Sequence, residues 1–263
     1  MNAMPPATEL IIDARYNGPR GLGNGGYVAG ALAECVAEDA EVRLQQGFPL
    51  DTPLTVVRDA EGGMRCLLGD LQLGTARSVV LDFAIPSPPT PAAAAEATGR
   101  FCCIHFSDPR GCYVCSPQRA PGEGLRVFCG PLESGGELIV AGVWVPDAAL
   151  ADAQGRIAPR LVWAALDCPG SYAIATLEPD AGRQLLGTCA ATLRRPLRAG
   201  ARYILSSWQV APPEGRKRFM GVAIHDAEGV LCAAARQIWI AVAAPADATA
   251  TIDTNAAEEN HHG

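Results

Sequence analysis

The sequence predicts an α+β fold in which an antiparallel sheet wraps around a central helix, and it predicts this arrangement twice. Two segments have apolar residues at helical spacing, about 25–40 and 159–176, and short apolar runs bounded by turn residues surround each of them. Pro169-Gly170 lies inside the second segment and is expected to kink that helix or end it early. The proline-rich stretch Ser87–Pro91 separates the two rounds. The expected division is 1–86 for the N-terminal half, 87–118 for a linker with a cysteine-rich segment, 119–243 for the C-terminal half, and 244–263 for a disordered tail.

Composition limits the class of protein. The chain has 263 residues, 49% of them hydrophobic, which is enough for a substantial core. No apolar run approaches the ~20 residues of a membrane span, and the start of the chain lacks the pattern of a signal peptide. The formal net charge is −7, and Lys217 is the one lysine, which argues against a nucleic-acid surface. We therefore expect a soluble cytoplasmic protein that binds neither nucleic acid nor membrane.

A glycine-rich loop leads directly into the first predicted helix. Gly21, Gly23, Gly25 and Gly26 lie in this loop and at its junction with the helix, and Asn24 is a favourable N-cap residue. The N–H groups of a first helical turn have no intrahelical partner and lie at the positive end of the helix dipole, so they can hold a developing oxyanion. The alternative is a loop and a cap that bind no ligand.

The same glycines also match the spacing of a dinucleotide-binding loop, with Glu41 near the expected position of the ribose-binding acid. That loop must follow directly on a buried strand, whereas four residues, 17–20, separate the apolar run Leu10–Tyr16 from Gly21. The alternation of strands and helices that such a fold requires is also missing downstream. We therefore reject this interpretation.

The ten cysteines are interpreted as reduced core residues, because a disulfide framework is not expected in a cytosolic chain of this length. Cys112 and Cys115 have the Cys-x-x-Cys spacing that can supply two thiolates to zinc, with His105 nearby as a further ligand. A second Cys-x-x-Cys pair is missing. We therefore predict no bound metal, and zinc at these three residues is the lesser alternative.

Several passages resemble a known family. The Asn24-Gly25-Gly26 start of the first helix resembles that of hotdog-fold acyl-CoA thioesterases of the phenylacetate-pathway type. Four other passages are similar to the double-hotdog branch of thioesterase-like proteins, namely Cys112–Pro117, Gly124–Arg126, Val162–Gly170 and Gly215–Lys217. The resemblance covers about 9–242. It implies a tandem hotdog fold, with two long central helices each wrapped by an antiparallel sheet in an internal pseudo-dimer.

The resemblance also implies a catalytic pair. In the phenylacetate-type enzymes the N–H of the first glycine polarises the thioester carbonyl, and an Asp eight positions further along the partner subunit's helix is the nucleophile or base. Here the residue eight positions after Gly25 is Ala33, whereas Asp167 lies eight positions after Pro159, which has no N–H. Gly25 and Asp167 are therefore expected to face each other across one cleft, with the second cleft inactive and Asn24 orienting the loop or the thioester.

Asp167 has an alternative interpretation as a residue that caps or hydrogen-bonds exposed backbone. It follows an apolar segment, so its burial is costly unless it is paired or its pKa is raised, which favours a functional role. Glu34, one position past Ala33, is the weaker candidate and is expected to face solvent.

The substrate is expected to be an acyl-CoA, with no cofactor apart from the coenzyme A that is part of it. Gly26, Tyr27 and Trp163 are candidates to line an acyl pocket, and Arg216 and Lys217 to meet the phosphates of coenzyme A. The alternatives are ordinary core for the first group and a solvated hairpin tip for the second.

Two functions remain open on this fold, a thioester hydrolase and a non-catalytic protein that binds or senses acyl-CoA. A hydratase is disfavoured because His105 and His225 are not near an acid on the helix loop. A homodimer of double-hotdog chains is compatible with the pattern.

Overall fold

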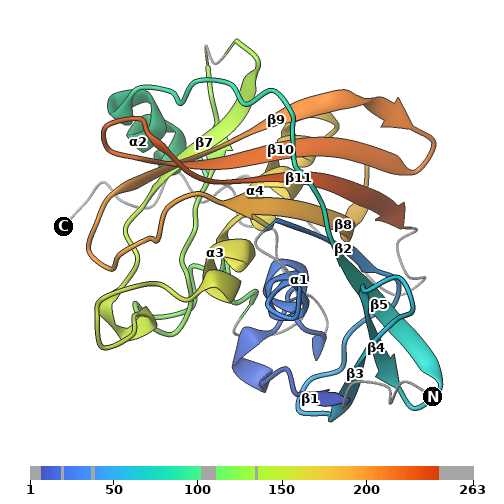
Figure 1. Ribbon diagram of the computed structural model, residues 1–263. Helices are drawn as coiled ribbons and strands as arrows, with labels where there is room; N and C mark the ends of the chain where they lie inside the picture. Colours follow the sequence, from blue (N-terminus) through green and yellow to red (C-terminus); the bar gives the residue numbers. More distant parts are fainter. Residues whose placement is uncertain (1–6, 19–20, 37–38, 102–110, 134–135, 243–263) are drawn as a thin grey trace.

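The computed structural model describes residues 7–18, 21–36, 39–101, 111–133 and 136–242 (Figure 1). The described residues form an 11-stranded sheet in the order β1-β3-β4-β5-β2-β8-β11-β10-β9-β7-β6, with antiparallel neighbours. The strands are β1 Thr8–Leu10, β2 Ala40–Leu44, β3 Leu54–Arg58, β4 Met64–Leu68, β5 Leu71–Ser78, β6 Gly130–Pro131, β7 Leu138–Trp144, β8 Arg183–Leu193, β9 Tyr203–Glu214, β10 Lys217–Asp226 and β11 Leu231–Val242.

The strands of the two halves meet between β2 and β8. Ala40 pairs with Ala191, and Val42 pairs with Cys189. These four side chains are fully buried, and their small size lets a helix pack closely on the junction. The sheets of the two halves therefore join edge to edge into one continuous surface.

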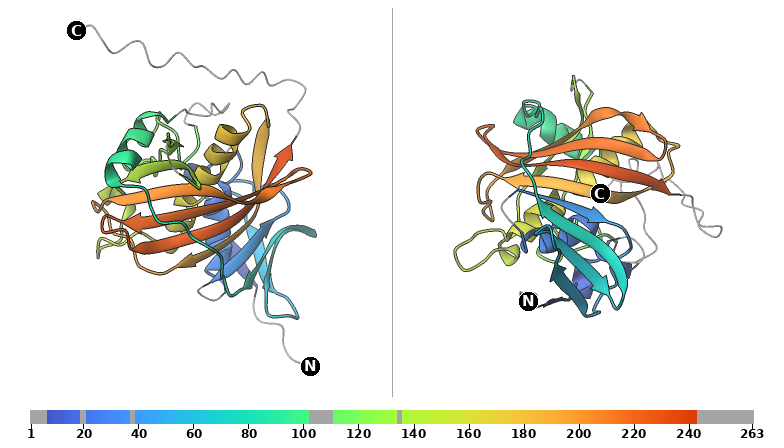
Figure 2. Two further views of the ribbon diagram at one scale, coloured as in Figure 1. Left: turned by 90° about the horizontal axis from the view of Figure 1, so that it is seen from above. Right: turned by 45° about the vertical axis from the view of Figure 1, so that its right-hand side comes forward.

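Three helices lie on the inner face of the curved sheet (Figures 1 and 2). They are α1 Gly25–Ala33, α3 Pro159–Ala165 and α4 Cys168–Leu177. α1 packs against α3 and against β2, β5 and β8, whereas α4 packs against β7, β9 and β10. The main hydrophobic core lies between these helices and the sheet. No helix in the described part of the chain is long and apolar enough to span a membrane.

The prediction of two long central helices is wrong. α1 ends at Ala33, and the chain has turned into β2 by Ala40, although the intervening residues favour a helix. The second segment divides into α3 and α4 because Pro169 has no N–H to continue the hydrogen bonding of α3. This break places Asp167 directly before the first turn of α4.

The outer face of the sheet, on the side away from α1, α3 and α4, is also covered over the strands of the C-terminal half. Residues 79–90 run across β11, β10 and β9 and lead into the helix α2 Pro91–Gly99 (Figure 1). Phe83 stacks on Trp208 of β9, with ring centroids 6.1 Å apart, and Ala94 and Ala97 of α2 pack against Ala141 of β7. The first part of the stretch assigned to the linker, through α2, is thus packed on the sheet.

Candidate active site

The start of α1 is capped as the sequence predicts. Asn24 is buried in an extended conformation, and its Oδ1 accepts a hydrogen bond from the Tyr27 N–H at 2.9 Å. The Val28 N–H makes the first intrahelical bond, to the Asn24 carbonyl. The N–H groups of Gly25 and Gly26 remain available for partners outside the helix.

Asp167 occupies the position opposite this helix start. Its side chain is 4% exposed. Its Oδ2 accepts one hydrogen bond from Asn24 Nδ2 at 2.8 Å and another from the Gly26 N–H at 2.9 Å. A Cβ atom placed on Gly25 would lie 3.5 Å from the same oxygen. The structure thus brings together Asn24, Gly25 and Asp167 from opposite halves of the chain.

Two glycines one helical turn apart allow this approach. A Cβ atom on Gly26 would lie 2.6 Å from the Trp163 carbonyl oxygen, and one on Gly30 would lie 2.7 Å from the Arg160 Cα. Both positions face α3, because residues at i and i+4 share one side of a helix. Close packing of α1 against α3 therefore requires glycine at both positions.

The two glycines at the start of α1 differ in what their N–H groups do. Gly26 is buried and donates to Asp167, so its N–H is not available to a substrate. Gly25 is partly exposed, and none of the residues that the structure describes accepts a hydrogen bond from its N–H. Gly25 therefore offers an uncommitted donor at the positive end of α1, where an anion is stabilised. Gly26 orients the carboxylate, which differs from its predicted contact with substrate.

The carboxylate of Asp167 is chemically unusual. Burial raises its pKa to about 7; hydrogen bonds from the Gly26 N–H and Asn24 lower it, whereas nearby Cys112 raises it further. Its Oδ1 atom is buried and has no hydrogen-bond partner within the described structure. A buried carboxylate with one oxygen held and the other unpartnered is suited to accept a proton or to attack a carbon atom.

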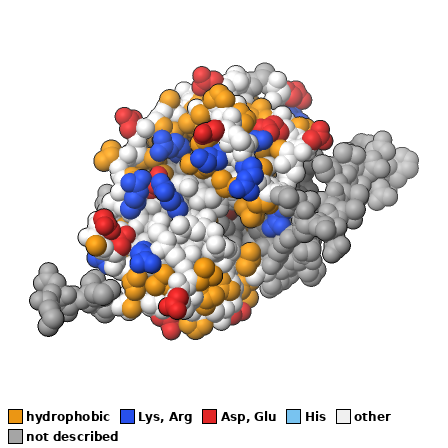
Figure 3. Space-filling model, turned by 90° about the vertical axis from the view of Figure 1, so that its right-hand side faces the viewer, with side chains coloured by type: hydrophobic (Ala, Val, Ile, Leu, Met, Phe, Trp, Pro, Cys, Tyr) orange, Lys and Arg blue, Asp and Glu red, His pale blue; other side chains and the backbone are white. Residues whose placement is uncertain are grey.

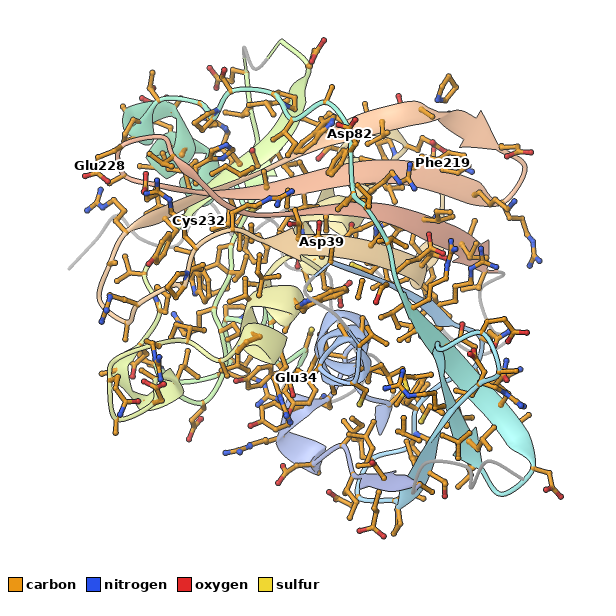
Figure 4. The ribbon with its side chains drawn as sticks, viewed as in Figure 1. Glu34, Asp39, Asp82, Phe219, Glu228 and Cys232 are labelled. Carbon is orange, nitrogen blue, oxygen red and sulfur yellow. The ribbon has the colours of Figure 1, made fainter. Side chains whose placement is uncertain are left out.

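The other end of the contact between α1 and α3 carries an ion pair in place of this arrangement. Arg160 Nε donates to Glu34 Oε1 at 3.0 Å, and Arg160 Nη2 pairs with the second Glu34 oxygen. Glu34 lies at the C-terminal end of α1, beside α3 (Figure 4). Pro159 begins α3 and has no N–H to offer an oxyanion. Glu34 was expected to face solvent, and the structure shows it partly exposed and paired.

Tyr27 and Trp163, the predicted pocket residues, are 4% and 3% exposed in the hydrophobic core. The Tyr27 ring stacks on Tyr16 with centroids 3.8 Å apart, and Tyr113 lies edge-on to Tyr16 at 4.9 Å. In this structure both residues pack as core residues, which was the alternative interpretation.

Arg216 and Lys217 are exposed at the turn between β9 and β10. The next residue, Arg218, pairs with Glu178 at 2.7 Å, which ties this turn to the end of α4. The ten residues of α4, which span about 15 Å, separate Glu178 from Asp167. Figure 3 looks at the right-hand side of the molecule as drawn in Figure 1. Several basic side chains lie close together on this face.

Three buried cysteines lie beside the carboxylate. The Sγ atoms of Cys112, Cys115 and Cys168 all lie within 4.8 Å of one another. Asn24 Nδ2, which holds Asp167, is also 3.7 Å from Cys112 Sγ. Hydrogen bonds from the Cys115 and Cys168 thiols hold the pKa of Cys112 well below its usual range. His105 lies outside the described residues.

Sequence reasoning missed the participation of Cys168. It directly follows Asp167 in a passage that already marks the site, but no local spacing connects it with Cys112, which is 56 positions away. Only the folded chain brings Cys168 next to Cys112 and Cys115.

The antiparallel sheet curved around its helices is the architecture of the hotdog fold. No protein-family model matches the sequence, and no curated protein matches it. Among solved structures, the chain is similar to the tesB protein of Mycobacterium avium subspecies paratuberculosis, at 12% identity and a TM-score of 0.58, over 90% of this chain and 93% of that one. At such identity the likeness establishes the fold.

Two further structures give the same result. A putative thioesterase II from Thermobifida fusca is 16% identical, with a TM-score of 0.58, over 90% of this chain and 92% of that one. A conserved protein of unknown function with a hot dog fold from Alicyclobacillus acidocaldarius is 11% identical, with a TM-score of 0.58, over 93% and 96%. The predicted resemblance to hotdog thioesterase-type proteins is thus confirmed at the level of the fold.

Proposed function

We propose that this protein hydrolyses an acyl-CoA-type thioester between its two halves, which act as the two subunits of a hotdog dimer. The observation that carries the proposal is the meeting of Asp167, from the C-terminal half, with the uncommitted Gly25 N–H, from the N-terminal half. An acid and an oxyanion donor are the two elements that acyl transfer requires, and each half supplies one of them.

In the proposed reaction, the thioester carbonyl oxygen binds at the Gly25 N–H. The unpartnered Oδ1 of Asp167 takes a proton from a water molecule, whose oxygen attacks the carbonyl carbon. The carbon–sulfur bond then breaks, and coenzyme A leaves as a thiol with the proton that Asp167 took from water. In the second version of this step, Oδ1 attacks the carbon directly and the carbon–sulfur bond breaks to release the coenzyme A thiolate. Water then hydrolyses the resulting anhydride to the free carboxylic acid and the Asp167 carboxylate, and a proton set free in this hydrolysis converts the thiolate to the thiol.

Gly26 and Asn24 support this chemistry indirectly. Both donate to Asp167 Oδ2, so they fix the carboxylate and leave Oδ1 as the reacting atom. At the other end of the helix pair, Arg160 neutralises Glu34, and Pro159 provides no donor. We therefore propose one working site per chain.

A second function remains in competition, a non-catalytic protein that binds or senses an acyl ligand on the same fold. Burial of the Asp167 carboxylate favours it, because Oδ1, the proposed reacting atom, is closed off from solvent in this structure. A binding protein requires the space between the halves and not the acid.

The deciding experiment is an assay of the purified chain against a panel of aromatic and aliphatic acyl-CoAs. Release of coenzyme A should be followed by chromatography, because accessible thiols of the chain, such as the partly exposed Cys35, also react with thiol dyes. A hydrolase releases coenzyme A in repeated turnovers. Saturable binding of the same compounds without release would support the binding protein.

A further inference from the structure

The cysteine cluster has the dimensions of a metal site. The Cys112 and Cys168 Sγ atoms are 3.9 Å apart. Two thiolates on a tetrahedral zinc ion, with Zn–S bonds of ~2.3 Å, are about 3.8 Å apart. Cys115 Sγ completes a compact triangle with them. These separations fit three sulfur atoms around one ion, and they are far longer than the ~2.05 Å of a disulfide bond.

The loop that carries two of the cysteines is built to present sulfur. The Val114 N–H donates to Cys112 Sγ at 3.4 Å, and the Ser116 N–H donates to the Cys112 carbonyl at 3.1 Å, which closes a tight turn between the two cysteines. Gly111 begins this turn at a φ of +64°, where a side chain is disfavoured. Donors aimed at a sulfur atom stabilise its thiolate form, as groups around metal ligands commonly do.

The third cysteine comes from a different element. Cys168 is the first residue of α4, where the helix dipole stabilises a negative charge. In contrast, neither Cys66, which has Cys35 near it, nor Cys129 belongs to such a group of three in the described ranges, and burial raises the pKa of each thiol. Convergence of three sulfur atoms is therefore a specific feature of this cluster and not a general property of the buried cysteines.

We propose that Cys112, Cys115 and Cys168 bind one zinc ion as three thiolates and so tie the loop at 111–118 to the start of α4. No other His, Cys, Asp or Glu side chain in the described ranges joins the group, so these three thiolates are the ligands that the described part of the chain supplies. The ion is structural. It holds the residue that follows Asp167, and it does not depend on the proposed hydrolysis.

The sequence alone led to the opposite expectation, because it contains one Cys-x-x-Cys pair and His105 as the further candidate ligand. In the structure a third sulfur atom, that of Cys168, joins the pair. Zinc binding is then the favoured interpretation, since three converging thiolates form most of a structural zinc site.

The test is metal analysis of the full-length, tag-free chain purified under reducing conditions. We expect one zinc per chain in the parent protein and in Cys66→Ser and Cys129→Ser, and loss of the metal in Cys115→Ser and Cys168→Ser. Loss of zinc from either control, retention in Cys168→Ser, or another metal in stoichiometric amount would overturn the assignment.

A second measurement on the parent protein keeps the test valid if the variants fail to fold. The metal is removed with a chelator, and Co²⁺ is then titrated into the reduced chain. We expect saturation at one Co²⁺, with a thiolate-to-metal charge-transfer band in the near ultraviolet and the intense visible bands of a tetrahedral ion. Absence of these bands, with the thiols still reduced, would contradict the proposal.

Discussion

The Gly26 N–H donates to Asp167 Oδ2 at 2.9 Å, although the two residues are 141 positions apart in the chain. This contact divides the work of the two adjacent glycines. Gly26 holds the acid of the other half, whereas the Gly25 N–H has no acceptor among the described residues. It also requires α1 and α3 to pack at the distance that Gly26 and Gly30 permit. The packing of α1 against α3 therefore also sets the position of Asp167 relative to the start of α1.

Substitution of the two glycines by alanine should separate stability from activity. A Cβ atom on Gly26 would lie 2.6 Å from the Trp163 carbonyl oxygen, which is backbone and cannot move freely. We expect Gly26→Ala to lose roughly 1–3 kcal/mol of unfolding free energy, as for other overpacked sites. Urea denaturation would measure it, and an unchanged midpoint would show that the helices can separate at no cost.

Gly25→Ala should behave differently. Its Cβ atom would lie 3.2 Å from both Cβ and Cδ2 of Leu186, with no backbone atom as close, so a shift of a few tenths of an ångström should let the fold tolerate the change. The added methyl group crowds the approach to the Gly25 N–H. We expect a loss of turnover toward the ~10²-fold that removal of an oxyanion donor costs, with little change in stability. Parent-like hydrolysis by a folded Gly25→Ala would remove this N–H from the mechanism.

Asn24→Ser tests the support of the carboxylate. Serine is as good an N-cap as asparagine, so α1 should remain capped through the Tyr27 N–H. It is too short to replace the bond from Asn24 Nδ2 to Asp167 at 2.8 Å. A lost hydrogen bond to a charged group is worth about 1.5–3 kcal/mol, so turnover should fall about tenfold or more. Equal turnover in the parent protein and in Asn24→Ser would show that Asn24 only caps α1 and does not support the carboxylate.

Burial of Asp167 should affect stability in a pH-dependent way. Its pKa is raised from 3.8 to about 7, so between those values the folded chain binds a proton that the unfolded chain does not. Stability due to this group is therefore full below about pH 4, decreases up to about pH 7 and stays lower above it. With EDTA present, we expect Asp167→Asn to melt a few degrees above the parent at pH 8.

That advantage should disappear near pH 4. Thermal denaturation of both proteins across this range is the measurement. A constant difference between their melting temperatures would show that Asp167 does not titrate as its burial predicts.

The sequence predicted the parts of the site that leave a local pattern. The glycine-rich start of α1, its Asn24 cap and the isolated acid Asp167 are each visible within a few residues. It did not predict that α1 ends at Ala33, because the residues after it favour a helix and the pairing of β2 with β8 overrides that preference. Local spacing does not report contacts between distant segments.

The sequence could not predict the different contacts of Gly25 and Gly26. Both are glycines at adjacent positions, and they differ only in orientation toward α3. The third cysteine of the cluster required the fold for the same reason. Pro169 indicated a break in the second helix, but the use of that break, which places both Asp167 and Cys168 beside α1 and the cysteine loop, became visible only in the structure.

The measurement that tests the central claim most directly is hydrolysis by Asp167→Asn beside Glu34→Gln, the matched change in the acid at the other end of α1. We expect Asp167→Asn to lose ~10²-fold or more in turnover while acyl-CoA binding changes little, because general bases contribute 10²–10⁴-fold. Glu34→Gln should stay close to the parent, since its partly exposed ion pair with Arg160 contributes only about 0–1 kcal/mol to stability. Parent-like hydrolysis by Asp167→Asn, or an equal loss in Glu34→Gln, would contradict a single site built on Asp167 and Gly25.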